Sequence, residues 1–102
     1  MYKQISMAEA KEIMSTEEEF IILDVRTQEE YADGHIPGAI CVPNETIGTE
    51  PPVELPDKEE KILVYCRSGN RSRQAAAKLA AMGYSNIVEF GGIMDWNGEI
   101  EK

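Results

Sequence analysis

A short polar loop after an apolar run carries the residue types best suited to chemistry. Cys66 follows the apolar residues 62–65, and the next six residues are Arg67, Ser68, Gly69, Asn70, Arg71 and Ser72. A helix is expected to begin at Ser72, so the thiol would lie between a strand end and a helix N-terminus, where backbone N–H groups favour anions. Such a position stabilises the thiolate, the nucleophilic form of cysteine. The pattern predicts that Cys66 is a catalytic nucleophile.

The means of activating this cysteine can also be judged from the residues available. The usual activator is a histidine. The only one is His35, in a Gly-His-Ile-Pro-Gly turn, and nothing in the sequence brings it to Cys66. Acyl transfer of the papain type, which needs such a base, is therefore disfavoured. The thiolate would instead be held by loop amides, the helix dipole, Arg67 and Arg71, an arrangement that suits attack on an anionic substrate.

The length of the loop limits the group that it can enclose. Ser68 and Gly69 are small, so the loop can curl until its N–H groups converge on an anion. Cys66 and Arg71 are spaced as Cys-x4-Arg. A phosphate-hydrolysing cysteine loop has Cys-x5-Arg spacing, which is one residue longer. We therefore expect this loop to enclose a smaller group, such as a single transferred sulfur atom.

The distribution of charge indicates which partners the chain would attract. Its 102 residues carry a net charge of −9, which argues against nucleic acid and anionic membranes as partners. Residues 61–88 nevertheless contain five basic residues and no acidic one, and this window includes Cys66. An electropositive region in an acidic chain would draw a small anion to the thiol.

Length and cysteine content bound the class of protein. A chain of this size, with 42% hydrophobic residues, fits one globular domain over residues 1–102, and nothing in it demands more than a monomer. Two cysteines and one histidine do not supply a metal site, and no cofactor is indicated. Few cysteines favour a reducing compartment, and without a signal peptide or a membrane span the expected location is cytoplasmic.

Helices and strands are expected to alternate along the chain. The expected strands lie at 2–5, 20–25, 39–42, 61–65 and 87–88, and the expected helices at 6–15, 27–33, 72–83 and 93–96. The proline-rich stretch 43–57 is expected to cross the surface with one helical turn. This alternation predicts an α/β domain with a central, mostly parallel five-stranded sheet flanked by helices. Ligands of such sheets bind beyond the carboxyl ends of the strands, where Cys66 would lie.

Four other polar side chains are expected to have structural roles. Cys41 lies in a strand-like run and is expected in the core, with a role as a resolving thiol as the minor alternative. Asp24 would bond loop amides at the end of its strand. Arg26 would pair with Glu29 or Glu30, and His35 would tie its turn to neighbouring backbone.

Four segments in order along the chain resemble the signatures of the rhodanese sulfurtransferase family. The first is Leu23-Asp24-Val25-Arg26 with Glu29, Glu30 and Tyr31; the others are residues 34–39, the loop 66–72, and Gly91-Gly92 with Trp96. The resemblance covers nearly the whole chain and implies the three-layer rhodanese fold. The loop length implies the sulfurtransferase branch of the family.

The resemblance also implies a reaction. Cys66 would accept sulfane sulfur from thiosulfate or a small persulfide, and the amides of residues 67–72 would cradle the resulting persulfide. Arg67 and Arg71 would hold the anionic remainder, and cyanide or a thiol would then take the sulfur in a ping-pong cycle. A persulfide carrier that delivers sulfur to a partner protein is the alternative. A phosphatase or arsenate reductase is less compatible with the loop length.

Overall fold

The computed structural model describes all 102 residues and shows five parallel strands in one sheet. The strand order across the sheet is β1-β5-β4-β2-β3, so the strand that ends in Cys66 is central. The strands are β1 (Lys3–Gln4), β2 (Ile21–Asp24), β3 (Ile40–Cys41), β4 (Ile62–Cys66) and β5 (Ile87–Gly92). The α-helices are α1 (Met7–Thr16), α2 (Gln28–Asp33) and α3 (Asn70–Ala81), with 3₁₀ turns η1 (Asn44–Thr46) and η2 (Ile93–Asp95).

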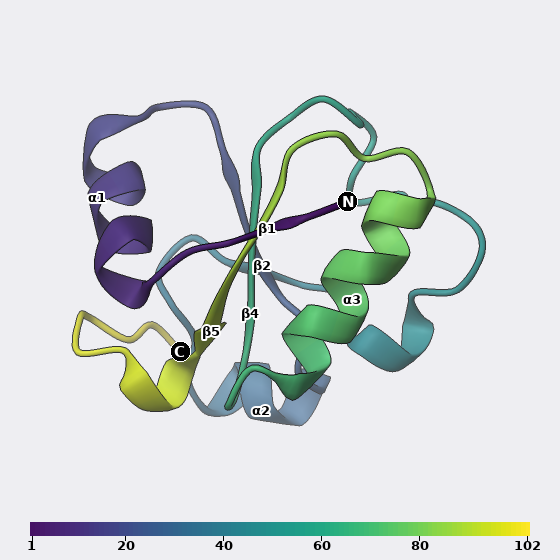
Figure 1. Cartoon of the computed structure of the whole chain (residues 1–102). Helices are drawn as coiled ribbons and strands as arrows, with labels where there is room; N and C mark the ends of the chain where they lie inside the picture. The colour runs from purple at the N-terminus through teal and green to yellow at the C-terminus, as the bar shows by residue number, and fades with distance from the viewer.

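The sheet forms the middle of three layers, with α1 on one side and α3 on the other (Figure 1). Side chains alternate along a strand, so β4 contributes to both faces. Val64 and Cys66 belong to the core on the α3 side, whereas Leu63 and Tyr65 belong to the core on the α1 side. The expected α/β fold is confirmed, and Cys66 lies on the side that α3 covers.

The two N-terminal helices begin where their capping residues predict. Ser6 accepts a hydrogen bond from the backbone N–H of Glu9, and the Glu9 carboxylate accepts one from the Ser6 backbone, which completes a capping box. Thr27 and Glu30 form the same arrangement at α2. Each boundary depends on two residues that are three positions apart, so it can be predicted from the sequence. No helix in the structure combines the length and apolar character needed to cross a bilayer.

Three boundaries near Cys66 differ from expectation. Helix α3 begins at Asn70 and not at Ser72, because Gly69 adopts a left-handed conformation with φ of 112° and forms the N-cap. Strand β5 continues through Gly92, although a glycine pair usually ends a strand. The expected closing helix is only the turn η2. The end of β5 pairs with Cys66, and η2 binds the Arg67 carbonyl through the Met94 N–H. These contacts join segments that are far apart in the sequence, so no local pattern predicts them.

A buried ionic cluster joins β2 and β4 and corrects one expected pairing. The guanidinium of Arg26 binds the carboxylate of Asp24, with an Nη2–Oδ2 distance of 2.7 Å, and does not bind Glu29 or Glu30. The hydroxyl of Tyr65 donates to the same carboxylate oxygen. Asp24 also accepts the backbone N–H of Arg26, so it bonds a loop amide as expected.

Replacing Arg26 with methionine is expected to destabilise the fold strongly. The change leaves Asp24 buried with much of its charge uncompensated, which typically costs about 3–5 kcal/mol. Urea unfolding at neutral pH measures this loss. Lys61→Met, which breaks the partly exposed pair with Glu17, serves as the matched control and is expected to cost at most about 1 kcal/mol. Equal losses for the two variants would contradict the prediction.

Candidate active site

Cys66 ends β4 with its sulfur beneath the active loop, which we define as residues 66–71. The residue is 1% exposed. Its Sγ accepts a hydrogen bond from the backbone N–H of Gly69 at 3.0 Å, and the hydroxyl of Ser72 lies 3.6 Å away. The structure therefore gathers the amides of the expected loop around the expected nucleophile.

These contacts determine how easily the thiol ionises. Burial by itself raises the pKa of Cys66, because the charged form loses hydration. Hydrogen bonds from the Ser72 hydroxyl and from the backbone N–H groups of Ser72, Gly69 and Ser68 act in the other direction. Their combined effect is larger, and the pKa of Cys66 lies below the ordinary value of 9.0. The loop is arranged to hold an anion at Sγ.

The C-terminal segment supports the loop from behind. The backbone N–H of Met94 in η2 donates to the carbonyl of Arg67 at 3.2 Å. Gly92, which is paired with Cys66 across the sheet, lies so close that an added Cβ would be 2.0 Å from the same carbonyl oxygen. The expected signature residue Gly92 therefore acts by allowing the loop backbone to approach β5.

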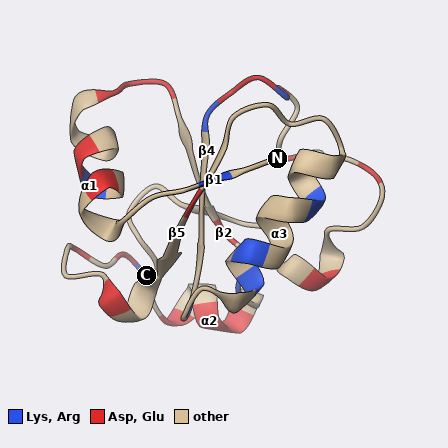
Figure 2. Ribbon diagram, in the orientation of Figure 1, with Lys and Arg blue, Asp and Glu red and all other residues tan.

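The two loop arginines occupy different situations. The guanidinium of Arg71 binds both carboxylate oxygens of Glu30, at 2.6 and 3.0 Å. Arg67 is exposed and forms no ion pair. In Figure 2 the basic first turns of α3 lie beside the acidic α2. The anion-binding charge expected from both arginines is thus partly neutralised by Glu30.

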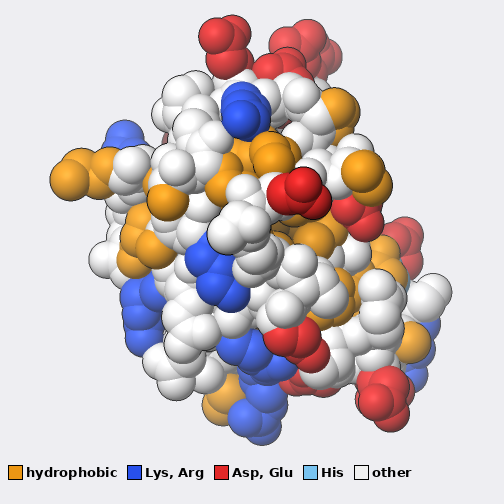
Figure 3. All heavy atoms as spheres, turned by 90° about the vertical axis from the view of Figure 1, so that its right-hand side faces the viewer, with side chains coloured by type: hydrophobic (Ala, Val, Ile, Leu, Met, Phe, Trp, Pro, Cys, Tyr) orange, Lys and Arg blue, Asp and Glu red, His pale blue; other side chains and the backbone are white.

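The remaining basic residues of the window 61–88 are also partly engaged. Lys61 pairs with Glu17, and Lys78 donates to the backbone carbonyl and side chain of Asn44. Arg73 is exposed and bonds the Asn70 side chain. Figure 3 shows blue basic side chains gathered on the face around α3, with acidic side chains close by. Residues 61–88 therefore form a locally positive region in which Lys61 and Arg71 are paired with acidic residues.

Acid titration is expected to reveal the Glu30–Arg71 pair. Hydrogen bonds from Arg71 lower the pKa of Glu30 from 4.5 to about 2, against the raising effect of partial burial. A lowered folded-state pKa adds stability above pH 4.5, and this share disappears as the pH falls toward 2. The free energy of unfolding should therefore decline more between pH 5 and 2 in the wild type than in Glu30→Gln, by about 1 kcal/mol after discounting for solvent exposure. Parallel declines would contradict this expectation.

A buried acid near the cysteine has no counterpart in the sequence-based prediction. Glu89 in β5 is 3% exposed, and its carboxylate accepts hydrogen bonds from the Ser72 hydroxyl at 2.6 Å and from the Gly91 N–H at 2.8 Å. An acidic residue inside the apolar run 87–90 was the available signal. It lies one residue beyond the acid-free window.

His35 and Cys41 lie apart from the sulfur of Cys66. His35 stacks on Tyr31 and its Nδ1 lies 2.9 Å from the Tyr31 carbonyl oxygen, so it ties its own turn together. Cys41 is in the edge strand β3, which β2 separates from β4. It is half-buried, and burial raises its pKa to about 11. Two strand spacings amount to about 10 Å, which is too far for direct attack on Cys66.

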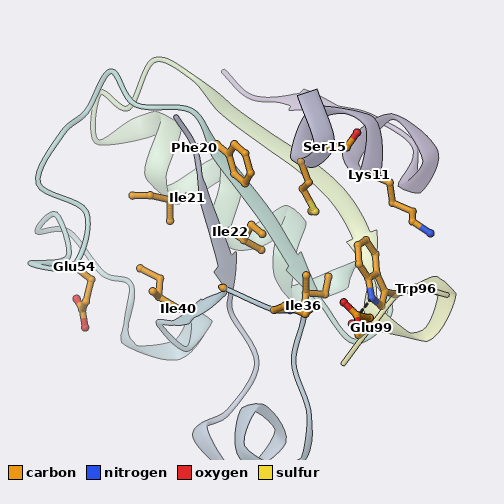
Figure 4. Close-up of a pocket in the computed structure, with 13 residues that line it drawn as sticks. Lys11, Ser15, Phe20, Ile21, Ile22, Ile36, Ile40, Glu54, Trp96 and Glu99 are labelled. Carbon is orange, nitrogen blue, oxygen red and sulfur yellow. Dashed lines mark hydrogen bonds between the residues drawn. The ribbon is translucent and has the colours of Figure 1, made fainter. Parts of the chain in front are cut away.

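A cavity borders the α1 side of the sheet, on the opposite face from Cys66. It has a volume of about 670 Å³ and is bordered by α1, the start of β2 and the C-terminal segment. Figure 4 shows Phe20, Ile22, Ile36 and Trp96 around it. None of its lining residues belongs to the active loop. The cavity is separate from the cysteine site.

Comparison with known proteins agrees with this geometry. Residues 6–99 match the family model of the rhodanese-like domain. The chain belongs to the rhodanese-like family. It is similar to the thiosulfate sulfurtransferase PspE of Escherichia coli, with 37% identity over 73 residues that cover 72% of this chain and 70% of that protein. The thiosulfate sulfurtransferase GlpE of Coxiella burnetii is 35% identical over 97 residues, covering 94% of this chain and 88% of the relative.

Structural similarity extends over almost all of the rhodanese-like chain. The rhodanese-like domain of the Alr3790 protein from Anabaena sp. superimposes with a TM-score of 0.87 at 31% identity. That match covers 99% of this chain and 80% of the other. The named relatives support a sulfurtransferase activity of the rhodanese type.

Proposed function

We propose that this rhodanese-like chain transfers sulfane sulfur from thiosulfate or a small persulfide to a thiophilic acceptor, through a persulfide on Cys66. The observation that carries the proposal is the convergence of the Gly69 N–H, 3.0 Å from Sγ, with the Ser68 and Ser72 amides on one buried sulfur. Donors placed in this way stabilise a thiolate and, after transfer, a persulfide anion of similar charge.

In the first half-reaction the Cys66 thiolate attacks the outer sulfur of thiosulfate. A new S–S bond forms at Cys66, the S–S bond of thiosulfate breaks, and sulfite leaves with the bonding electron pair. The exposed guanidinium of Arg67 binds the departing sulfite. Arg71 adds positive charge near the site while it remains paired with Glu30. In the second half-reaction cyanide or a thiol attacks the outer sulfur, and the Cys66 thiolate is the leaving group.

Intact-mass measurement tests the proposal. The wild-type protein incubated with thiosulfate is expected to gain the mass of one sulfur atom, and cyanide should remove it as thiocyanate. No mass gain with thiosulfate or with glutathione persulfide would overturn the proposal. A loaded protein that discharges to a protein thiol much faster than to cyanide would indicate a persulfide carrier, the alternative use of the same site.

A further inference from the structure

Glu89 presents a buried negative charge that the proposed reaction does not use. The side chain forms no ion pair, and its partners are Ser72, the Gly91 N–H and the amide of Gln4 at 3.3 Å. Hydrogen bonds offset only part of the cost of burying a carboxylate without a cation. The position of Glu89 next to the nucleophile points to a role for its charge.

Ser72 connects this carboxylate to the cysteine sulfur. Its Oγ lies 2.6 Å from Oε2 of Glu89 and 3.6 Å from Sγ of Cys66. Ser72 is fully buried, and Cys66 and Glu89 are only 1% and 3% exposed. Oγ of Ser72 also lies 3.0 Å from the Gly69 carbonyl oxygen and 3.3 Å from that of Gly91, but the contact with Glu89 is the shortest. A hydroxyl carries a single proton, so Ser72 cannot donate fully to the carboxylate and to the sulfur at the same time.

We propose that Glu89 accepts the proton of Cys66 through the Ser72 hydroxyl. The S–H proton moves to Oγ of Ser72 as the O–H proton moves to Oε2 of Glu89. The products are a Cys66 thiolate that accepts a hydrogen bond from Ser72, and a neutral Glu89 acid that donates one to Ser72. One proton changes place, and no electron is gained or lost. Glu89 is in this sense a positioning residue, because it acts through Ser72.

This transfer, unlike release of the proton to water, leaves the net charge of the cluster unchanged. Before and after the transfer, Glu89, Ser72 and Cys66 together carry one negative charge. Release to water would leave two buried negative charges separated by one hydroxyl, and such like-charge pairs are strongly disfavoured. The buried environment that penalises the double anion leaves the transfer unaffected. The network therefore supplies a base at a site where the only histidine, His35, does not contact the sulfur.

The neighbouring charges do not remove the need for this transfer. From α3, Arg71 acts on Cys66 but is bound to Glu30, and Arg73 is exposed and bonds Asn70. From β1, Lys3 is exposed. Across the sheet, Tyr65 of β4 belongs to the core on the other face. Arg67 is exposed in the active loop. None of these groups binds Glu89.

The pH profile of alkylation at Cys66 tests the inference. Iodoacetamide reacts with the thiolate, and peptide mass spectrometry follows the rate at Cys66 alone. In the wild type the rate should rise in two steps, with a plateau across neutral pH, because the first deprotonation is shared between Cys66 and Glu89. Glu89→Gln removes one titrating group, so its profile should show a single step. A single step in the wild type, or two steps in Glu89→Gln, would overturn the inference.

Further variants separate the relay from simple packing. Ser72→Ala breaks the connection and should lower the rate at neutral pH by about 10-fold or more. Ser72→Thr keeps a hydroxyl and should restore the two-step profile. Glu18→Gln removes an exposed charge far from the site and should leave the profile unchanged. A two-step profile that survives Ser72→Ala would contradict the role of the hydroxyl.

A measurement on the wild type alone covers the case in which Glu89→Gln fails to fold. At neutral pH the infrared spectrum should contain a protonated carboxylic acid band that disappears when Cys66 is alkylated, because Glu89 then ionises. No loss of such a band would overturn the inference. The relay rests on the proposed function for its purpose, but neither measurement uses a sulfur donor. A protein that shows the two-step alkylation profile but gains no sulfur from a donor would contradict only the proposed function.

Discussion

Replacing Cys66 with serine is expected to abolish sulfur loading from thiosulfate. The side chain keeps nearly the same volume, so the loop and the helix α3 should remain folded. The hydroxyl cannot ionise at neutral pH and cannot form a stable persulfide. Turnover with thiosulfate and cyanide should fall by about 10⁴-fold or more, as expected when a covalent nucleophile is removed. Intact mass after incubation with thiosulfate checks the result directly.

Cys41→Ser is the matched control for this prediction. Cys41 has a raised pKa and lies on the far side of β2, so its replacement should leave sulfur loading intact. If loading survives Cys66→Ser and disappears with Cys41→Ser, the persulfide forms on Cys41, which would contradict the assignment. Circular dichroism of both variants establishes that each is folded.

Replacing Gly92 with alanine is expected to damage both the fold and the loop. Gly92 has an extended backbone with φ of −139°, so alanine meets no conformational penalty there. The penalty is steric, because the new Cβ would lie 2.0 Å from the Arg67 carbonyl oxygen and 2.6 Å from Cα of Ser68. Both are backbone atoms that cannot rotate away. We expect a loss of about 3 kcal/mol or more in unfolding free energy.

The same change should impair chemistry beyond its effect on stability. Displacing the loop by about 1 Å misplaces the amides that surround Sγ, and such a shift can cost about 100-fold in rate. Two glycines provide controls. Gly48→Ala meets open space and should stay within about 0.5 kcal/mol of the wild type. Gly91→Ala also has open space but a φ of 100°, so it isolates backbone strain, at about 1–3 kcal/mol. A Gly92→Ala variant no worse than Gly91→Ala would contradict the steric argument.

Features that depend on neighbouring residues could be predicted from the sequence. The capping boxes at Ser6 and Thr27 use partners three residues away, and the structure shows both. The apolar run before Cys66 indicates a strand that is buried on both faces, as the central parallel strand β4 is. The order of the four signature segments led to the right family. Local chemistry and pattern therefore determined the outline of the fold.

Features that depend on distant partners could not be predicted in this way. Glu30 and Arg71 are 41 residues apart, so a charge pattern cannot show that the carboxylate occupies the guanidinium. Glu89 and Ser72 meet only because α3 packs on β5, which brings together residues 17 apart. The pair of Arg26 is different, because its partner is local: acidic side chains lie two, three and four residues away, and the one that Arg26 binds is Asp24, the last residue of β2. Opposite charges near each other in sequence do not identify the pair that forms.

The position of β2 between the two cysteines has a consequence for oxidative damage. A thiolate at Cys66 is open to conversion by peroxides to a sulfenic acid, and the usual first protection is condensation with a nearby thiol. Cys41 cannot provide it, because β2 separates β3 from β4 and no disulfide spans that gap. Within these 102 residues, oxidised Cys66 has no internal partner. Protection of Cys66 by disulfide formation therefore requires a thiol from another molecule.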